Sequence, residues 1–204
     1  MQNHDYFLPG VAAIILAAVV PIYWVGLIAS QTIGDSNVLG QNWTALELSD
    51  AVFALIPLLS IYIYLNLKKI LNEQLNFNHI DLLVLIMVAA NAIWLGTLCL
   101  DLAAAVLPEQ TVMQNQDIFL GIGLSVSIGV IILCGILDLV IGILLLANSI
   151  NLPTLLKIFA VMSVIQGVIG ITVVFAAALI VIFPITLIVL AMFFLRKPES
   201  IEIV

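Results

Sequence analysis

Charged residues are scarce in this chain of 204 residues: 8% are Asp, Glu, Lys or Arg, whereas 64% are hydrophobic. The longest stretch without any charge runs from residue 158 to residue 195, which is 38 residues and about 57 Å of helix. The hydrocarbon core of a bilayer is only about 30 Å thick. This stretch is therefore too long for one spanning helix and long enough for two.

Basic residues are the rarest charged type, and the five of them are Lys68, Lys69, Lys157, Arg196 and Lys197. They form no cluster of the size that binds nucleic acid or anionic lipid headgroups. We therefore expect no nucleic-acid partner.

Histidine and cysteine occur twice each. His4 and His79 both lie outside the apolar segments, which excludes a haem held between two histidines inside a bilayer. Cys99 and Cys134 lie in apolar segments at depths that differ by roughly 13 Å, too far apart for a disulfide. The sequence has neither a P-loop nor a His-Glu-x-x-His zinc helix. We expect no enzymatic activity, no cofactor and no bound metal.

Apolar segments recur along the whole chain, and each is near or above the length of about 20 residues that a spanning helix needs. The pattern predicts an all-α fold, a polytopic transmembrane helix bundle of six spans, with residues 1–204 forming one integral membrane domain. The predicted spans are residues 7–29, 48–67, 80–107, 118–147, 155–174 and 177–195.

The basic residues also predict the orientation of the six spans. If the N-terminus is cytoplasmic, all five basic residues fall in cytoplasmic segments, and the external loops 30–47 and 108–117 contain none. Cytoplasmic loops of membrane proteins carry an excess of Lys and Arg. We therefore expect both termini in the cytoplasm and a multi-pass protein of the cell (inner) membrane.

The last two predicted spans have no polar residue between them. A turn at Pro184 would leave about 11 residues before Arg196, roughly 17 Å of helix, which is too short to cross a bilayer. We therefore predict a tight reversal near Val174–Ala178, with Pro184 as a kink inside the last span.

Small residues recur every fourth position in the fourth span, at Gly121, Ser125 and Gly129. Such spacing lets helix backbones approach closely. We therefore predict a helix neighbour on this face. The same spacing occurs in two other pairs: Ser163 with Gly167, and Ala13 with Ala17.

Three polar residues lie near one depth in three different spans. Asp138, Asn91 and Gln166 are each roughly 18 Å from the predicted inner face, close to the bilayer midplane. No Lys or Arg lies at that depth to pair with Asp138, which favours protonation or cation binding for a buried carboxyl group. The three residues predict either a ligand or proton site at the midplane or a hydrogen-bonded clasp between helices.

Two more carboxyl groups lie near the predicted outer face. Asp101 is close to the external end of the third span, and Asp50 opens the second. Together they suggest a shallow acidic vestibule.

Two classes of function fit these observations, and no motif identifies a family. The first is a transport or small-solute or ion-binding component with its site at Asp138, Asn91 and Gln166. The second is a non-catalytic membrane subunit or scaffold that packs against other membrane proteins. Few polar residues inside the spans favour the second class, and the unpaired Asp138 favours the first. In both cases the lipid bilayer is the main partner.

Overall fold

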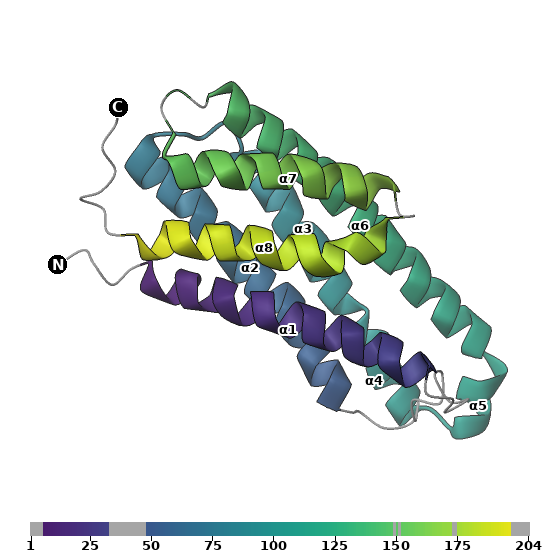
Figure 1. Ribbon diagram of the computed structural model, residues 1–204. Coiled ribbons are helices and arrows are strands. Elements are labelled where there is room, and N and C mark those ends of the chain that lie inside the picture. Colours follow the sequence, from purple (N-terminus) through teal and green to yellow (C-terminus); the bar gives the residue numbers. More distant parts are fainter. Residues whose placement is uncertain (1–5, 33–47, 149, 151, 173–174, 197–204) are drawn as a thin grey trace.

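The computed structural model describes residues 6–32, 48–148, 150, 152–172 and 175–196. Apart from a short 3-10 turn, the regular secondary structure of these residues is entirely α-helical (Figure 1). The helices are α1 (Phe7–Thr32), α2 (Leu48–Leu75), α3 (Asp81–Gly96), α4 (Leu98–Val106), α5 (Glu109–Gln114), α6 (Gln116–Ala147), α7 (Thr154–Thr172) and α8 (Ala176–Leu195).

Six stretches of these helices are long and apolar enough to cross a membrane. α3 and α4 act together as one of them, because they are separated only at Thr97, whose hydroxyl donates to the carbonyl of Trp94 at 2.7 Å. The predicted all-helical fold with six helices able to span a membrane is confirmed, and the cytoplasmic location of both termini stays a prediction. The stretches are Phe7–Gly26, Ser49–Leu75, Asp81–Val106, Gln116–Ala147, Thr154–Thr172 and Ala177–Leu195.

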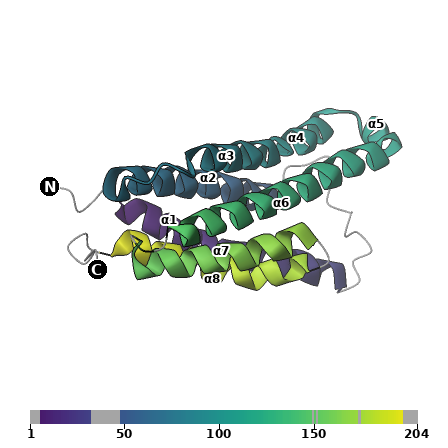
Figure 2. The same cartoon turned by 90° about the horizontal axis from the view of Figure 1, so that it is seen from above.

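The six spans form a closed ring. Each span packs against its neighbour in the sequence, α1 on α2, α2 on α3, α3 on α6, α6 on α7 and α7 on α8, and α8 then packs on α1. α1 begins and α8 ends at the same end of the bundle, which we call the terminal end (Figures 1 and 2). At this end a side chain on Gly10 of α1 would touch Leu195 of α8.

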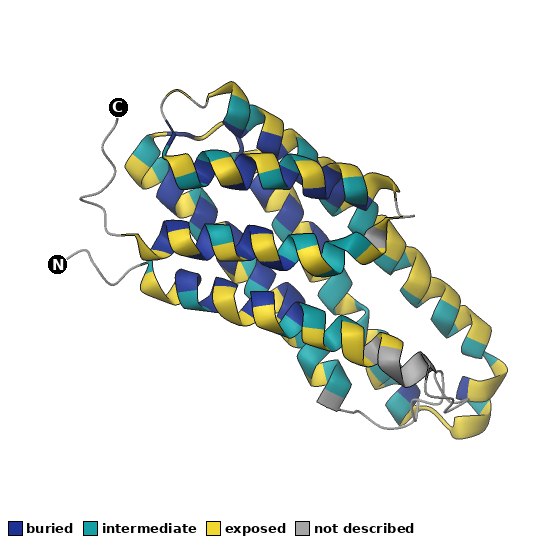
Figure 3. Cartoon of the chain, in the orientation of Figure 1, coloured by how far each residue is buried: buried dark blue, intermediate teal, exposed yellow. Residues whose placement is uncertain are grey.

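Burial follows the ring. On each long helix the buried residues form a stripe that faces the other helices, and large apolar side chains cover the outside (Figure 3). The apolar core is concentrated toward the terminal end, where Leu16, Leu67 and Leu156 are fully buried. An apolar outer surface of this extent suits a lipid environment.

The second span is longer than the sequence indicated. α2 continues past Leu67 to Leu75 and includes both Lys68 and Lys69. Lys68 pairs with Asp81 at the start of α3, at 3.6 Å. Asn76, with φ at 48°, then ends the helix in the left-handed conformation that asparagine tolerates. The short helix α5 in the connection after α4 was not predicted either.

The predicted reversal after the fifth span is confirmed. α7 ends at Thr172 and α8 begins at Ala176, so two separate helices occupy the long uncharged stretch. Val173 and Val174 lie outside the described residues. Pro184 lies inside α8, and its role as a kink stays a prediction.

Glycines allow α6 and α7 to approach each other most closely. A Cβ atom added to Gly167 would lie 2.5 Å from the backbone nitrogen of Leu139, and one added to Gly142 would lie 2.7 Å from the carbonyl oxygen of Ala160. Ser163, on the same face of α7, is fully buried. The predicted close packing at Ser163 and Gly167 is therefore confirmed. Ala13 and Ala17 are also buried, on α1.

The predicted packing face at Gly121, Ser125 and Gly129 is wrong. Ser125 is exposed, and a Cβ added to either glycine would meet nothing within 4 Å. The reason is the length of the neighbouring helix. Gly170, close to the end of α7, lies level with Gly135 on α6. The first part of α6 therefore extends beyond α7, and α7 cannot cover it.

The two kinds of glycine should respond oppositely to one substitution. Gly167→Ala should destabilise the fold by about 1–3 kcal/mol, because the added methyl group meets the backbone of Gly135 and the backbone and Cβ atom of Leu139, which cannot move aside easily. Gly129→Ala should leave stability unchanged or slightly raised, because alanine favours a helix over glycine by up to about 1 kcal/mol. Unfolding of both variants in the same detergent measures the difference. Equal melting of the two variants would contradict the close α6–α7 contact.

Candidate functional site

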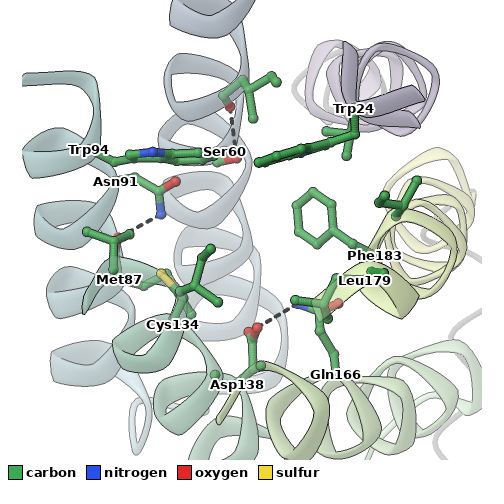
Figure 4. Close-up of a pocket in the computed structure, with 18 of the residues that line it drawn as sticks. Trp24, Ser60, Met87, Asn91, Trp94, Cys134, Asp138, Gln166, Leu179 and Phe183 are labelled. Atoms are coloured by element: carbon green, nitrogen blue, oxygen red, sulfur yellow. Dashed lines mark hydrogen bonds between the residues drawn. The ribbon is translucent and has the colours of Figure 1, made fainter. Parts of the chain in front are cut away.

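A cavity of about 430 Å³ lies inside the ring of helices, and all six spans contribute to its wall (Figure 4). This volume is within the range of about 300–1,000 Å³ typical of small-molecule sites. The described residues that line it are Val20, Trp24, Ile28, Ile56, Ser60, Tyr64, Met87, Asn91, Trp94, Val130, Ile131, Cys134, Gly135, Asp138, Gln166, Gly170, Ala177, Leu179, Ile180 and Phe183.

Asp138 of α6 forms one end of the cavity, and its carboxyl group is held from two sides. The hydroxyl of Tyr64 on α2 donates to Oδ1 at 3.2 Å, and the amide nitrogen of Gln166 on α7 donates to Oδ2. Only about one twentieth of each of Asp138 and Gln166 is exposed. The structure thus brings together two of the three residues that the sequence placed at one depth.

Asn91 lies on another part of the same cavity wall. Its Nδ2 donates to the carbonyl of Met87, one turn earlier in α3, at 2.9 Å. In Figure 4 it sits beside Trp94, on the opposite side of the cavity from Asp138. Asn91 therefore shares the cavity with Asp138 and Gln166, and its hydrogen bond to Met87 stays within its own helix.

The close contact between α6 and α7 positions the carboxyl group. Gly135 precedes Asp138 by one turn, and Gly167 follows Gln166 directly. A Cβ added to Gly167 would lie only 2.6 Å from the carbonyl oxygen of Gly135. The backbones of α6 and α7 are therefore so close that a side chain on one helix easily reaches a side chain on the other. The short distance between the two backbones brings the amide of Gln166 to Asp138.

Aromatic rings form the wall of the cavity on the side away from Asp138. Trp24 and Trp94 face the cavity at one level, with Phe183 beside them (Figure 4). Phe53 packs edge-on against Trp94, with ring centroids 5.2 Å apart, and Tyr23 packs edge-on against Trp24 at 5.8 Å. Tyr23 and Phe53 also contact each other at 6.2 Å. We call Tyr23, Trp24, Phe53 and Trp94 the aromatic cluster.

The two carboxyl groups of the predicted vestibule lie beyond the aromatic cluster. Asp50, Asp101 and Tyr23 lie close enough to one another to interact electrostatically. Both side chains are partly exposed. The structure therefore gathers Asp50 and Asp101 near the aromatic wall, and Asp138 lies on the opposite side of the cavity.

Sequence reasoning missed Tyr64, the second hydrogen-bond donor to Asp138. A signal for it was present in the second span. Ile56, Ser60, Tyr64 and Leu67 recur at helical spacing and all are buried, so Tyr64 belongs to the inward stripe, whereas Tyr62 is exposed. The two hydroxyl groups on this stripe, of Ser60 and Tyr64, both line the cavity.

Comparison with protein-family models, with curated proteins and with solved structures finds no match to this chain. Within the described residues no group of three or more His, Cys, Asp or Glu side chains could hold a metal ion. Both cysteines are free, Cys99 on an exposed surface and Cys134 at the cavity. The fold is that of a multi-pass membrane protein with an internal cavity.

The hydrogen bond from Tyr64 to Asp138 can be measured against a control two residues away. Tyr64→Phe should lower the free energy of unfolding by about 0.5–1.5 kcal/mol, because it removes one buried hydrogen bond and little volume. Tyr62→Phe makes the same chemical change on an exposed face of α2 and should have no effect. Denaturant titration in mixed micelles compares the two variants. Equal stabilities would show that the contact with Asp138 contributes nothing.

Proposed function

We propose that this protein binds a small organic solute in its central cavity and acts as a binding or transport component of the cell (inner) membrane. The observation that carries the proposal is the cavity itself, which is lined by all six spans and has a few polar groups among apolar ones. Small-molecule sites have this composition, since apolar walls give affinity and a few polar groups orient the ligand. Transporters also place their sites near the bilayer midplane.

Three of the polar groups that line the cavity are Asp138, Asn91 and Gln166. A clasp alone would need only the contact between Asp138 and its two donors. A cavity of about 430 Å³ lies beside these contacts, and a volume of this size favours a ligand-binding site over a purely structural clasp. The hydrogen bonds then serve to hold the carboxyl group in place.

Binding in the cavity is tested by filling it. Leu179 of α8 lines the cavity, and Leu179→Trp should occupy part of the volume. Leu82→Trp makes the same change on the exposed surface of α3. A library of small neutral, cationic and anionic compounds is screened by thermal shift against the protein in lipid nanodiscs. We expect compounds that raise the melting temperature of the wild type and of Leu82→Trp but not of Leu179→Trp. Shifts that are equal in both variants would place binding elsewhere.

The orientation is a second part of the proposal. The distribution of Lys and Arg supports a cytoplasmic location for the terminal end of the bundle. The vestibule formed by Asp50 and Asp101 would then face outward, and a solute would enter the cavity past the aromatic cluster.

Single cysteines test this orientation. In a background with Cys99 and Cys134 replaced by alanine, cysteine at Lys69 near the end of α2 should be protected from an impermeant thiol reagent added to intact cells. Cysteine at Gln110 in α5 should react. Both native side chains are exposed, so burial does not bias the comparison. Labelling at 69 but not at 110 would reverse the orientation.

The exposed small-residue face of α6 favours a second candidate function, a membrane subunit that packs against another spanning helix. Gly121, Ser125 and Gly129 leave a smooth face without a neighbour among the described residues. A photo-crosslinking residue at position 125 in native membranes should give one discrete protein adduct under this function. The same residue in place of Ile188 on α8, which is also exposed, serves as the control. Equal labelling at both positions would indicate lipid contact alone.

A further inference from the structure

The hydrogen bonds around the cavity leave it rich in acceptors. Ser60 donates its hydroxyl hydrogen to the carbonyl of Ile56 at 2.9 Å, and Tyr64 donates its own to Asp138. Each hydroxyl has a single hydrogen, so both oxygens can only accept from a further partner. The two carboxylate oxygens of Asp138 have lone pairs to spare, since each accepts one hydrogen bond in the described structure and can accept about two.

The amide groups reinforce this bias. Asn91 must point its nitrogen at the carbonyl of Met87, because a carbonyl can only accept. Gln166 gives its nitrogen to Asp138, and its Oε1 is buried and has no hydrogen-bond partner in the described structure. The amide oxygens of both residues are therefore available to a donor. The donors that remain are the second N–H of each amide and the indole N–H of Trp94, which is also buried without a partner, so acceptors still outnumber donors.

The charges near the cavity have one sign. Among the described residues that line it, Asp138 has the only acidic side chain and there is no Lys, Arg or His. Its two described partners, Tyr64 and Gln166, are neutral. An ionised carboxylate inside a bilayer is costly unless a cation accompanies it. Asp50 and Asp101 are further acidic side chains, beyond the aromatic cluster.

The rest of the wall specifies the body of the ligand. A metal ion would leave most of a cavity of about 430 Å³ unfilled. Trp24, Trp94 and Phe183 face the cavity across from Asp138 (Figure 4). Aromatic walls of this kind pack against flat or apolar groups. The cavity thus has a polar, negatively charged end and an aromatic end.

We infer that the cavity binds an organic cation, a protonated amine attached to an aromatic or other apolar body. The ammonium group donates to Asp138 and to the amide oxygen of Gln166, and the body lies between Trp24, Trp94 and Phe183. This inference rests on the proposed function of the cavity as a small-molecule site and adds the chemical class of the ligand.

Three probes that share a phenyl ring and a two-carbon chain test the class of ligand: phenethylamine, 2-phenylethanol and 3-phenylpropanoate. At neutral pH the first is a cation, the second neutral and the third an anion. Binding is followed by tryptophan emission in a Trp43→Phe background in nanodiscs, where Trp24 and Trp94 report on the cavity. Empty nanodiscs correct for partition into lipid.

Phenethylamine should bind about 10- to 100-fold more tightly than 2-phenylethanol, as expected for a hydrogen bond to a charged group. The carboxylate probe should bind most weakly. Asp138→Asn should remove the preference for the amine and keep the affinity for the alcohol, which also reports that the cavity is intact. Asp117→Asn, the same change at an exposed position on the same helix, should alter neither affinity.

Equal affinity of the wild type for the amine and the alcohol would overturn the inference, as would a preference for the amine that survives Asp138→Asn. Binding of the alcohol or the carboxylate without such a preference would still support the proposed function. If none of the three probes binds and no library compound distinguishes Leu179→Trp from Leu82→Trp, the proposed function fails as well. The ratio measured on the wild type decides the inference even if Asp138→Asn does not fold.

Discussion

The buried carboxyl group of Asp138 is the constraint on which the arrangement of the helices depends. A carboxylate near the middle of a bilayer costs about 2.5–3.5 kcal/mol even on insertion scales, so α6 has to turn this side chain away from lipid. Tyr64 of α2 and Gln166 of α7 meet it from two sides. Because α2 and α7 are not neighbours in the ring, their contacts to one residue tie opposite parts of the bundle together.

The glycines of α6 and α7 make this arrangement possible. Gly135 and Gly167 bring the two backbones almost into contact beside Asp138. On the other side of α6 the neighbour is α3. The cavity lies at the centre of the ring, and all six spans line it. The glycines thus place Asp138 where it contacts Gln166 on one side and the cavity on the other.

Most of the fold could be predicted because the strongest signal in the sequence is the length of its uncharged segments. The thickness of the bilayer determines how long a spanning segment must be, so the number of spans follows from these lengths. The reversal before Ala176 followed from that argument alone. The face at Ser125 was mispredicted because spacing of small residues says that a helix can be approached, not that a neighbour is long enough to reach it. Tyr64 was missed because only amide and carboxyl side chains were compared for their depth in the bilayer. Its contact with Asp138 joins two helices that are not neighbours in the ring, so it depends on how the helices close into that ring. The cavity depends on the same closure, which a linear pattern does not contain.

The cavity and the hydrogen bonds beside it are best understood together. A group of polar side chains that served only to join helices would satisfy its members with one another. Here Gln166 donates one N–H to Asp138, and its amide oxygen has no partner. The indole nitrogen of Trp94 also has no partner, and both residues line the cavity. Unpaired buried polar groups cost about 1–3 kcal/mol each, so their presence is costly for a purely structural clasp. A bound solute that supplies donors at Asp138 and Gln166 and fills the aromatic end would remove that cost, which is why the arrangement favours a binding site over a structural contact.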